Sequence, residues 1–147
     1  NYRMTNLQAA LGVAQLSRLE EFIIKRIEIS NTYKELLHPC PYIITFPEQV
    51  GGTIHTNWLF CVRLVKTINT DKLLENMLRH GIELRKVFYP LSSMPIYERY
   101  RFNTYERSHA FANHSISLPS STSLTYVQLQ YISSSLLHTL EKMQRSS

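Results

Sequence analysis

A run of apolar residues with helical spacing begins almost at the start of this chain and continues to a proline at position 39. Thr5 and Gln8 have the spacing of a capping box, in which each side chain bonds the other residue's backbone amide, so a helix is predicted to begin here. The helical pattern ends at His38, because the proline that follows disfavours helical geometry there. We therefore predict one helix of about 30 residues, or about 45 Å in length.

That helix is too long for the rest of the chain to cover. The remaining residues, roughly 110, would form a body about 30 Å across. Part of the helix is therefore expected to face another domain or another chain, and the small residues of its first half, such as Ala10 and Gly12, permit close approach of a neighbouring backbone. Periodicity alone is equally consistent with a plain core helix.

Alternating strands and helices follow the long helix. Residues 58–65 have the period-two pattern of a half-buried strand, and Thr70 is predicted to cap a helix over 71–80 that ends at Gly81. The other predicted elements are a β-rich run at 42–46, strands at 82–88 and 115–118, and helices at 104–113 and after a second capping box at Thr125 and Gln128. The pattern predicts an α+β fold: a long N-terminal helix and a small sheet of about three antiparallel strands covered by helices.

The inward-facing apolar positions of these elements supply one core. Its predicted members are Trp58, Phe60, Val62, Leu64, Ile82, Leu84, Ile132, Leu136 and Leu140. A chain of 147 residues with 44% hydrophobic content can bury one core of ordinary size. We expect a single domain over residues 1–147, with residues 1–38 as the long helix and residues 39–147 as a small α+β domain.

Hydropathy, cysteine spacing and net charge indicate where the chain resides and what kind of partner it binds. No apolar stretch approaches the roughly 20 residues that cross a bilayer, so a cytoplasmic protein without a membrane contact is expected. Cys40 and Cys61 have neither metal-ligand nor disulfide spacing, so we expect reduced thiols and no metal site. The net charge of +5 favours an anionic partner such as nucleic acid, a phosphate cofactor or a nucleotide sugar, without choosing among them.

Three segments carry a resemblance to a known family. The first is Asn1-Tyr2-Arg3-Met4-Thr5-Asn6-Leu7-Gln8-Ala9-Ala10-Leu11-Gly12; the second runs from Gly81-Ile82-Glu83-Leu84-Arg85 through Phe88-Tyr89-Pro90-Leu91 to Met94-Pro95-Ile96-Tyr97; the third is Ser117-Leu118-Pro119-Ser120-Ser121 ahead of Leu124-Thr125. In order and separation these segments resemble the DegT/StrS family of pyridoxal-phosphate-dependent sugar aminotransferases. The resemblance covers essentially the whole chain.

The resemblance implies the aspartate-aminotransferase fold. In that family a large domain carries the lysine that forms a Schiff base with pyridoxal phosphate, a smaller C-terminal domain closes over the site, and a dimer partner completes it. This chain resembles the small domain with its preceding long helix. The implied partners are a large catalytic domain, a second copy contacting through the long helix, and a nucleotide sugar.

The resemblance also implies that no residue of this chain is catalytic. The family's lysine lies upstream of the first matching segment, as do the acid that pairs with the pyridine nitrogen and the ring that stacks on the cofactor. None of the six lysines of this chain has a sequence context that suits a replacement nucleophile. We therefore expect the chain to be inactive by itself and to hold no covalently bound pyridoxal phosphate.

On the cofactor side, the resemblance assigns Asn1 to the phosphate of pyridoxal phosphate, reached across a dimer, and an amide can donate to a phosphate oxygen. Arg3 has the same assignment, with a surface ion pair as its alternative. The alternative for Asn1 is an ordinary turn residue before a capped helix.

On the substrate side, the resemblance assigns His55, Glu83, Arg85 and Tyr89 to the nucleotide-sugar pocket. Glu83 and Arg85 point the same way on a predicted strand, a spacing that also suits a mutual salt bridge. His55 precedes the strand at 58–65 and has a purely structural role as its alternative. The family often has a histidine where this chain has Ser92.

Two other classes of function remain. Residues 79–107 carry six Lys or Arg and three Glu with interleaved tyrosines, a composition compatible with nucleic-acid binding, but their signs are mixed rather than spread as one cationic face. A non-catalytic interaction protein that keeps the dimer-forming helix is the third class, and the residues do not separate it from a fragment of an enzyme.

Overall fold

The computed structural model describes residues 3–46, 48 and 50–145. Its elements are α1 (Asn6–Leu16), α2 (Leu19–Leu37), β1 (Ile43–Thr45), β2 (Phe60–Leu64), α3 (Thr70–Arg79), β3 (Arg85–Lys86), the 3-10 turns η1 (Leu91–Ser93) and η2 (Pro95–Tyr100), α4 (Glu106–Asn113), β4 (Ser115–Leu118) and α5 (Tyr126–Arg145). The predicted α+β class is confirmed. Both predicted capping boxes form, at Thr5 with Gln8 and at Thr125 with Gln128.

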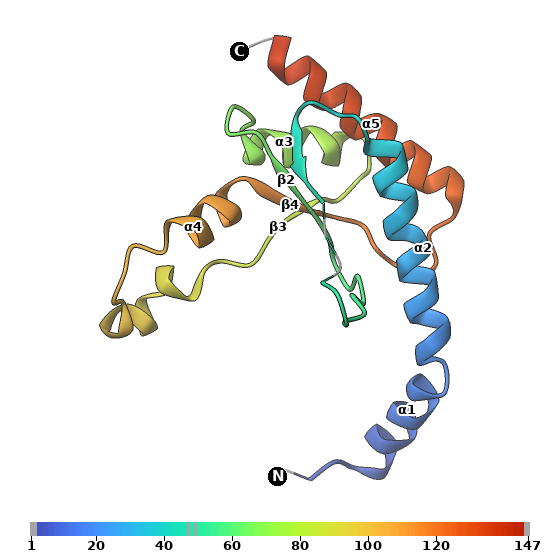
Figure 1. The fold of residues 1–147 in the computed structure, drawn as a ribbon. Helices are drawn as coiled ribbons and strands as arrows, with labels where there is room; N and C mark the ends of the chain where they lie inside the picture. The colour runs from blue at the N-terminus through green and yellow to red at the C-terminus, as the bar shows by residue number, and fades with distance from the viewer. Residues whose placement is uncertain (1–2, 47, 49, 146–147) are drawn as a thin grey trace.

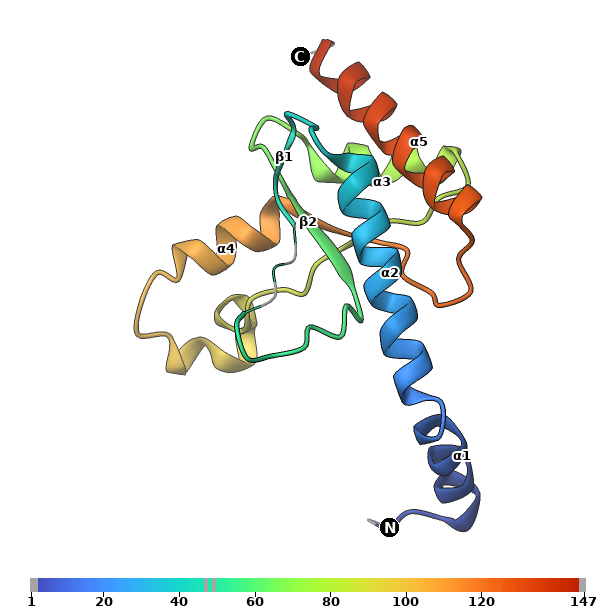
Figure 2. The ribbon, with the colours of Figure 1, turned by 45° about the vertical axis from the view of Figure 1, so that its right-hand side comes forward.

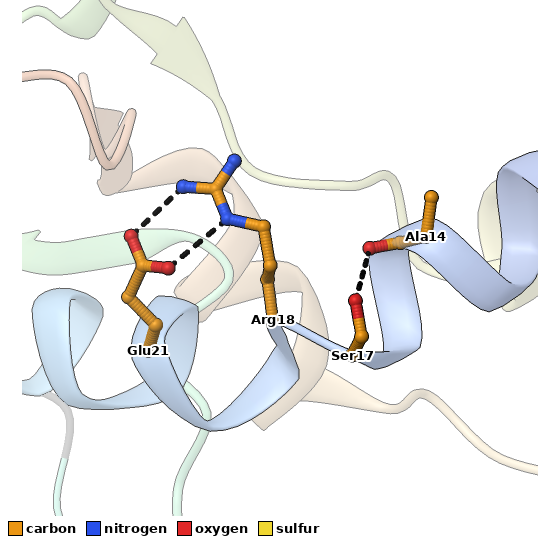
Figure 3. Close-up of polar contacts among 4 residues, drawn as sticks. All are labelled: Ala14, Ser17, Arg18 and Glu21. Atoms are coloured by element: carbon orange, nitrogen blue, oxygen red, sulfur yellow. Dashed lines mark hydrogen bonds and ion pairs between the residues drawn. The ribbon is translucent and has the colours of Figure 1, made fainter.

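The single N-terminal helix was a wrong prediction, because the helix breaks between α1 and α2. The Ser17 hydroxyl donates to the Ala14 carbonyl at 2.9 Å, and the Arg18 amide bonds Gln15 in a tighter turn at 3.1 Å. Arg18 then starts α2 and pairs with Glu21 through two hydrogen bonds of 2.8 and 3.0 Å (Figure 3). Serine hydroxyls compete for backbone carbonyls in this way. The longest helix is therefore the C-terminal α5, with 20 residues.

The sheet is antiparallel, as predicted, but in the described residues it has four strands in the order β1-β2-β4-β3. The fourth is the short β1, which pairs along the free edge of β2. The strand predicted over 82–88 shrinks to Arg85 and Lys86, because β4 has only four residues against which it can pair. Helix α3 starts one residue earlier than predicted, since Asn69 rather than Thr70 caps it.

Helices α2, α3 and α5 gather on the side of the sheet that carries Phe60, Val62 and Leu64 (Figures 1 and 2). Tyr33 of α2 stacks on Phe60 with ring centroids 5.0 Å apart, and its hydroxyl donates to the Pro119 carbonyl. Eight of the nine predicted core residues are buried: Phe60, Val62, Leu64, Ile82, Leu84, Ile132, Leu136 and Leu140. We call the sheet with α2, α3 and α5 the body.

Trp58 was wrongly assigned to the core, since 62% of its surface is exposed. It has the same parity as Phe60, but β2 begins only at Phe60, so the chain has left the sheet before it reaches Trp58. Its ring instead stacks on Phe88, with centroids 6.1 Å apart. The alternation of apolar residues in the sequence therefore extends one step beyond the N-terminal end of β2.

Two segments project from the body. Helix α1 extends beyond the end of α2, and residues 87–113, which we call the arm, lead away from the end of β3 and return through α4 (Figures 1 and 2). No residue of α1 or of the arm is buried, and the structure describes all of both. No helix in the described part of the chain combines the length and apolar character needed to cross a membrane.

Candidate functional site

The second and third matching segments meet in one groove. Its lining includes residues before and in β3 (Gly81, Ile82, Glu83 and Arg85), residues 117–121 at the end of β4 and after it, and Gln128 and Tyr131 at the start of α5. The groove has a volume of about 620 Å³, within the range of small-molecule sites. It forms because β3 is an edge strand and the chain turns at Pro119 before α5 begins.

Glu83 and Arg85 both line this groove, and they form the mutual salt bridge that their spacing allows. The guanidinium of Arg85 lies 3.2 Å from the Glu83 carboxylate, and both side chains are mostly exposed. An exposed pair of this kind adds little to stability. Both charged groups can therefore exchange the mutual contact for a ligand.

A second group of residues forms where α2, the loop before β2 and the turn after β4 meet. The guanidinium of Arg26 donates to the carbonyl oxygen of Trp58 at 2.7 Å, and the Ser120 hydroxyl donates to the same oxygen at 2.8 Å. Asn57, buried and with a left-handed φ of 49°, turns the chain so that this carbonyl faces both donors. Arg26 and Ser120 thereby fix the Trp58 backbone while its ring remains exposed.

His55 belongs to this second group, and neither His55 nor Tyr89 lines the groove. The backbone amide of Asn57 donates to Nδ1 of His55 at 3.0 Å, and the Asn57 side-chain amide donates to the His55 carbonyl at 3.0 Å. The Asn57 contact leaves Nε2 as the free nitrogen of the ring. Tyr89 follows Phe88, whose ring stacks on Trp58, and is exposed.

The structure thus separates the predicted substrate residues: Glu83 and Arg85 line the groove, His55 lies in the loop before β2, and Tyr89 is exposed in the arm. Arg3 is exposed at the far end of α1, and Asn1 lies outside the described residues. The roles of all six remain predictions.

The contact between His109 and Ser92 was not predicted from the sequence. His109 of α4 places Nε2 at 3.1 Å from the Ser92 hydroxyl, in the same loop where the family often has a histidine. Arg101 donates to the Ser92 carbonyl at 2.8 and 3.1 Å and holds that loop closed. The contact joins residues 17 positions apart, and neither residue has a local sequence signal for it.

The lysines of the chain lie away from the groove, and none of the six lines it. Lys25 pairs with Glu28 at 3.2 Å and Lys86 with Asp71 at 2.6 Å, so both ammonium groups have an acidic partner. In the described part of the chain no group of His, Cys, Asp or Glu has the arrangement of a metal site.

Cys61 lies on the face of β2 that turns away from the helices. Burial raises the pKa of its thiol, and a hydrogen bond with Ser117 opposes that rise in part. Because the thiolate is the reactive form, the protonated thiol is a poor nucleophile at neutral pH. Both cysteines are free thiols in the structure.

Comparisons with known proteins agree with the resemblance carried by the three segments. The sequence model of the DegT/DnrJ/EryC1/StrS aminotransferase family matches residues 1–137, so this chain belongs to that family. The family consists of pyridoxal-phosphate-dependent aminotransferases.

Individual relatives give the same result. GDP-perosamine synthase of Escherichia coli O157:H7 is 34% identical over 137 residues, which cover 92% of this chain and 36% of the relative. GDP-perosamine synthase of Caulobacter vibrioides is 31% identical over 138 residues, which cover 92% and 37%. The structure of Helicobacter pylori PseC, an aminotransferase involved in the biosynthesis of pseudoaminic acid, superposes with a TM-score of 0.85 at 28% identity, covering 97% of this chain and 39% of PseC. The chain thus spans a little over a third of the length of these relatives.

Proposed function

We propose that this chain is the C-terminal small domain, with its preceding helices, of a nucleotide-sugar aminotransferase that transfers an amino group to a keto-sugar nucleotide with pyridoxal phosphate as cofactor. Residues 1–38 lead into the domain, with α2 packing on its core, and residues 39–147 form the rest of it. The catalytic lysine belongs to a large domain, either in the same polypeptide or in a separate chain. By itself this chain is inactive.

The exposed apolar surface of α1 is the observation that carries the proposal. Leu7, Leu11, Val13 and Leu16 are each more than 60% exposed. Such a helix is expected to pack against a partner, because burying each exposed leucine side chain would contribute about 1.5–3 kcal/mol. An aminotransferase supplies two surfaces for it, the large domain and a second copy.

The arm fits the same proposal. Phe88, Tyr89, Ile96 and Phe102 are each at least 70% exposed, and the first three belong to the second of the segments that resemble the family. In the assembled enzyme the arm packs on the large domain, and the Trp58 ring, His55 and Tyr89 then form one wall of the sugar pocket. Glu83 and Arg85 contribute charge from the neighbouring groove.

Nucleic acid is a weaker fit, since half of the six cations of residues 79–107 are engaged elsewhere. Arg85 pairs with Glu83, Lys86 with Asp71, and Arg101 with the Ser92 carbonyl. A strand-binding surface needs free cations beside its stacking rings. A non-catalytic dimer-forming protein shares the exposed α1 with our proposal and is separated from it by experiment.

A chimera tests the proposal directly. Residues 1–147 replace the matching third of Escherichia coli GDP-perosamine synthase, and transamination of its keto-sugar nucleotide is measured. We expect turnover above that of the truncated synthase alone. The matched control carries Leu7→Glu and Leu11→Glu in the inserted segment and should lose that gain. A folded, dimeric chimera without turnover would contradict the small-domain role and favour the non-catalytic dimer.

The isolated chain provides the complementary test. After incubation with pyridoxal phosphate and reduction with borohydride, modified lysines are mapped by mass spectrometry. Scattered substoichiometric labelling is expected, because none of the six lysines lies in the groove. Stoichiometric labelling of one lysine, together with turnover of a keto-sugar nucleotide, would contradict the assignment of the catalytic lysine to another domain.

A further inference from the structure

A second groove, between α3 and α5, has a cationic lining. It has a volume of about 520 Å³ and shares no lining residue with the groove at Gly81–Arg85. Lys72 and Arg79 line it from α3, Lys142 from α5, and there is no Asp or Glu among its lining residues. We call it the α3–α5 groove. In a chain of net charge +5, positive charge collects along this lining.

Helix geometry brings the cations of this groove to one face. Lys72, Asn76 and Arg79 have the spacing i, i+4 and i+7, so they follow one side of α3 over about 10 Å. His138 and Lys142 have the spacing i, i+4 on α5, which lies against α3 (Figures 1 and 2). Donors from two helices therefore converge on one space.

Two donors on α3, Lys72 and Arg79, have no acidic partner among the described residues. The ion pairs among the described residues are made by Arg18, Lys25, Arg85 and Lys86, so Lys72 and Arg79 join none of them. In the same part of the chain the side-chain amide of Asn76, half-buried at the groove, makes no hydrogen bond. Thr67 accepts a hydrogen bond from Gln144 at 2.6 Å and so keeps its own hydroxyl proton to donate.

These donors select the class of ligand. Ammonium, guanidinium, amide and imidazole groups, in a lining that has no Asp or Glu, match phosphate oxygens. The lining contains no Phe, Tyr or Trp, so nothing there resembles the stacking platform that single-stranded nucleic acid uses. The volume of the groove is that of a small-molecule site. We propose that the α3–α5 groove binds a compact ligand with two or more linked phosphate groups, at a site separate from the sugar pocket.

Calorimetric titration of the 147-residue chain with sodium pyrophosphate, at constant ionic strength, tests this site. The double variant Lys72→Gln and Arg79→Gln removes two charges from the groove, and we expect at least tenfold weaker binding. The matched control, Lys25→Gln and Arg107→Gln, removes two charges from α2 and α4 and should bind within twofold of the parent. Circular dichroism verifies that both variants are folded.

Lys142→Gln provides an independent variant on the opposite helix, with an expected threefold or greater loss of pyrophosphate affinity. An equal loss in the two double variants would overturn the proposal, because it would show attraction by net charge alone. The absence of saturable pyrophosphate binding in the parent would overturn it as well. So would a single-stranded oligonucleotide that binds more tightly than pyrophosphate and whose affinity depends on Lys72 and Arg79.

Discussion

The body and the two projecting segments use apolar residues in opposite ways. Every buried apolar residue that the structure describes lies in α2, α3, α5, the sheet strands β2 and β4 or the short connections beside them. Helix α1 and the arm have leucines and aromatic rings of the same kinds, and none of them is buried. The body therefore buries its own apolar residues, whereas α1 and the arm have apolar surfaces that only a partner could bury.

This difference separates stability from assembly. Burial of apolar surface is the main favourable term in folding, so the free energy of unfolding of this chain resides in the body. Residues in α1 and the arm contribute to contacts that the isolated chain does not make. Substitutions in the two parts should consequently affect different measurements.

The largest effect is expected from Phe60→Ala. Phe60 is fully buried between Tyr33 and Phe46, and loss of a buried aromatic ring costs about 3–5 kcal/mol. Trp58→Ala is its matched control two residues away, and it should cost less than about 1 kcal/mol because most of that ring is exposed. Denaturant unfolding of the two variants measures the contrast. Equal costs would show that the body does not end at Phe60.

Helix α1 should show the reverse behaviour. The isolated chain is expected to self-associate, since uncovered apolar faces of this kind are uncommon on monomers. Leu7→Glu with Leu11→Glu should abolish that association and leave the unfolding midpoint of the body unchanged. Sedimentation equilibrium at high micromolar concentration measures the first effect. A monodisperse parent monomer at that concentration would count against the role of α1.

A smaller effect concerns pH. Because the pKa of Cys61 is raised in the folded chain, the unfolded chain releases this proton first as pH rises. The contribution of the thiol to stability is thus complete at neutral pH and falls once pH passes about 8.5, the value for an unfolded thiol. The parent should lose more stability than Cys61→Ala between about pH 8 and about pH 10. The buried Tyr33, whose pKa is also raised by burial, contributes equally to both and cancels.

Much of the body could be predicted from sequence because its signals are local. The capping boxes, the alternation through β2 and the stripe of α5 depend on neighbouring residues, and each leads to an observed element. The break after Leu16 has no proline or glycine to mark it, and the Ser17 hydroxyl is one of many that face a carbonyl. The β-rich run at 42–46 was too short to predict a sheet strand by itself. It forms β1 because it pairs with the edge of β2.

The candidate site was predictable only in part for the same reason. Glu83 and Arg85 are two residues apart, so their salt bridge could be expected from spacing. The bonds from Arg26 and Ser120 to the Trp58 carbonyl, and the contact of Ser92 with His109, join distant segments through the tertiary fold. Contacts between distant segments cannot be predicted from the spacing of residues along the chain.

Amide hydrogen exchange, resolved by residue and recorded in the dilute monomeric chain, tests the division between body and projections most directly. We predict that amides of β2, β4 and α5 exchange only through global unfolding, whereas amides of α1 and of the arm exchange at nearly unprotected rates, since few buried contacts hold them. Protection of α1 equal to that of α5 under these conditions would contradict the account, because α1 would then be part of a self-sufficient fold.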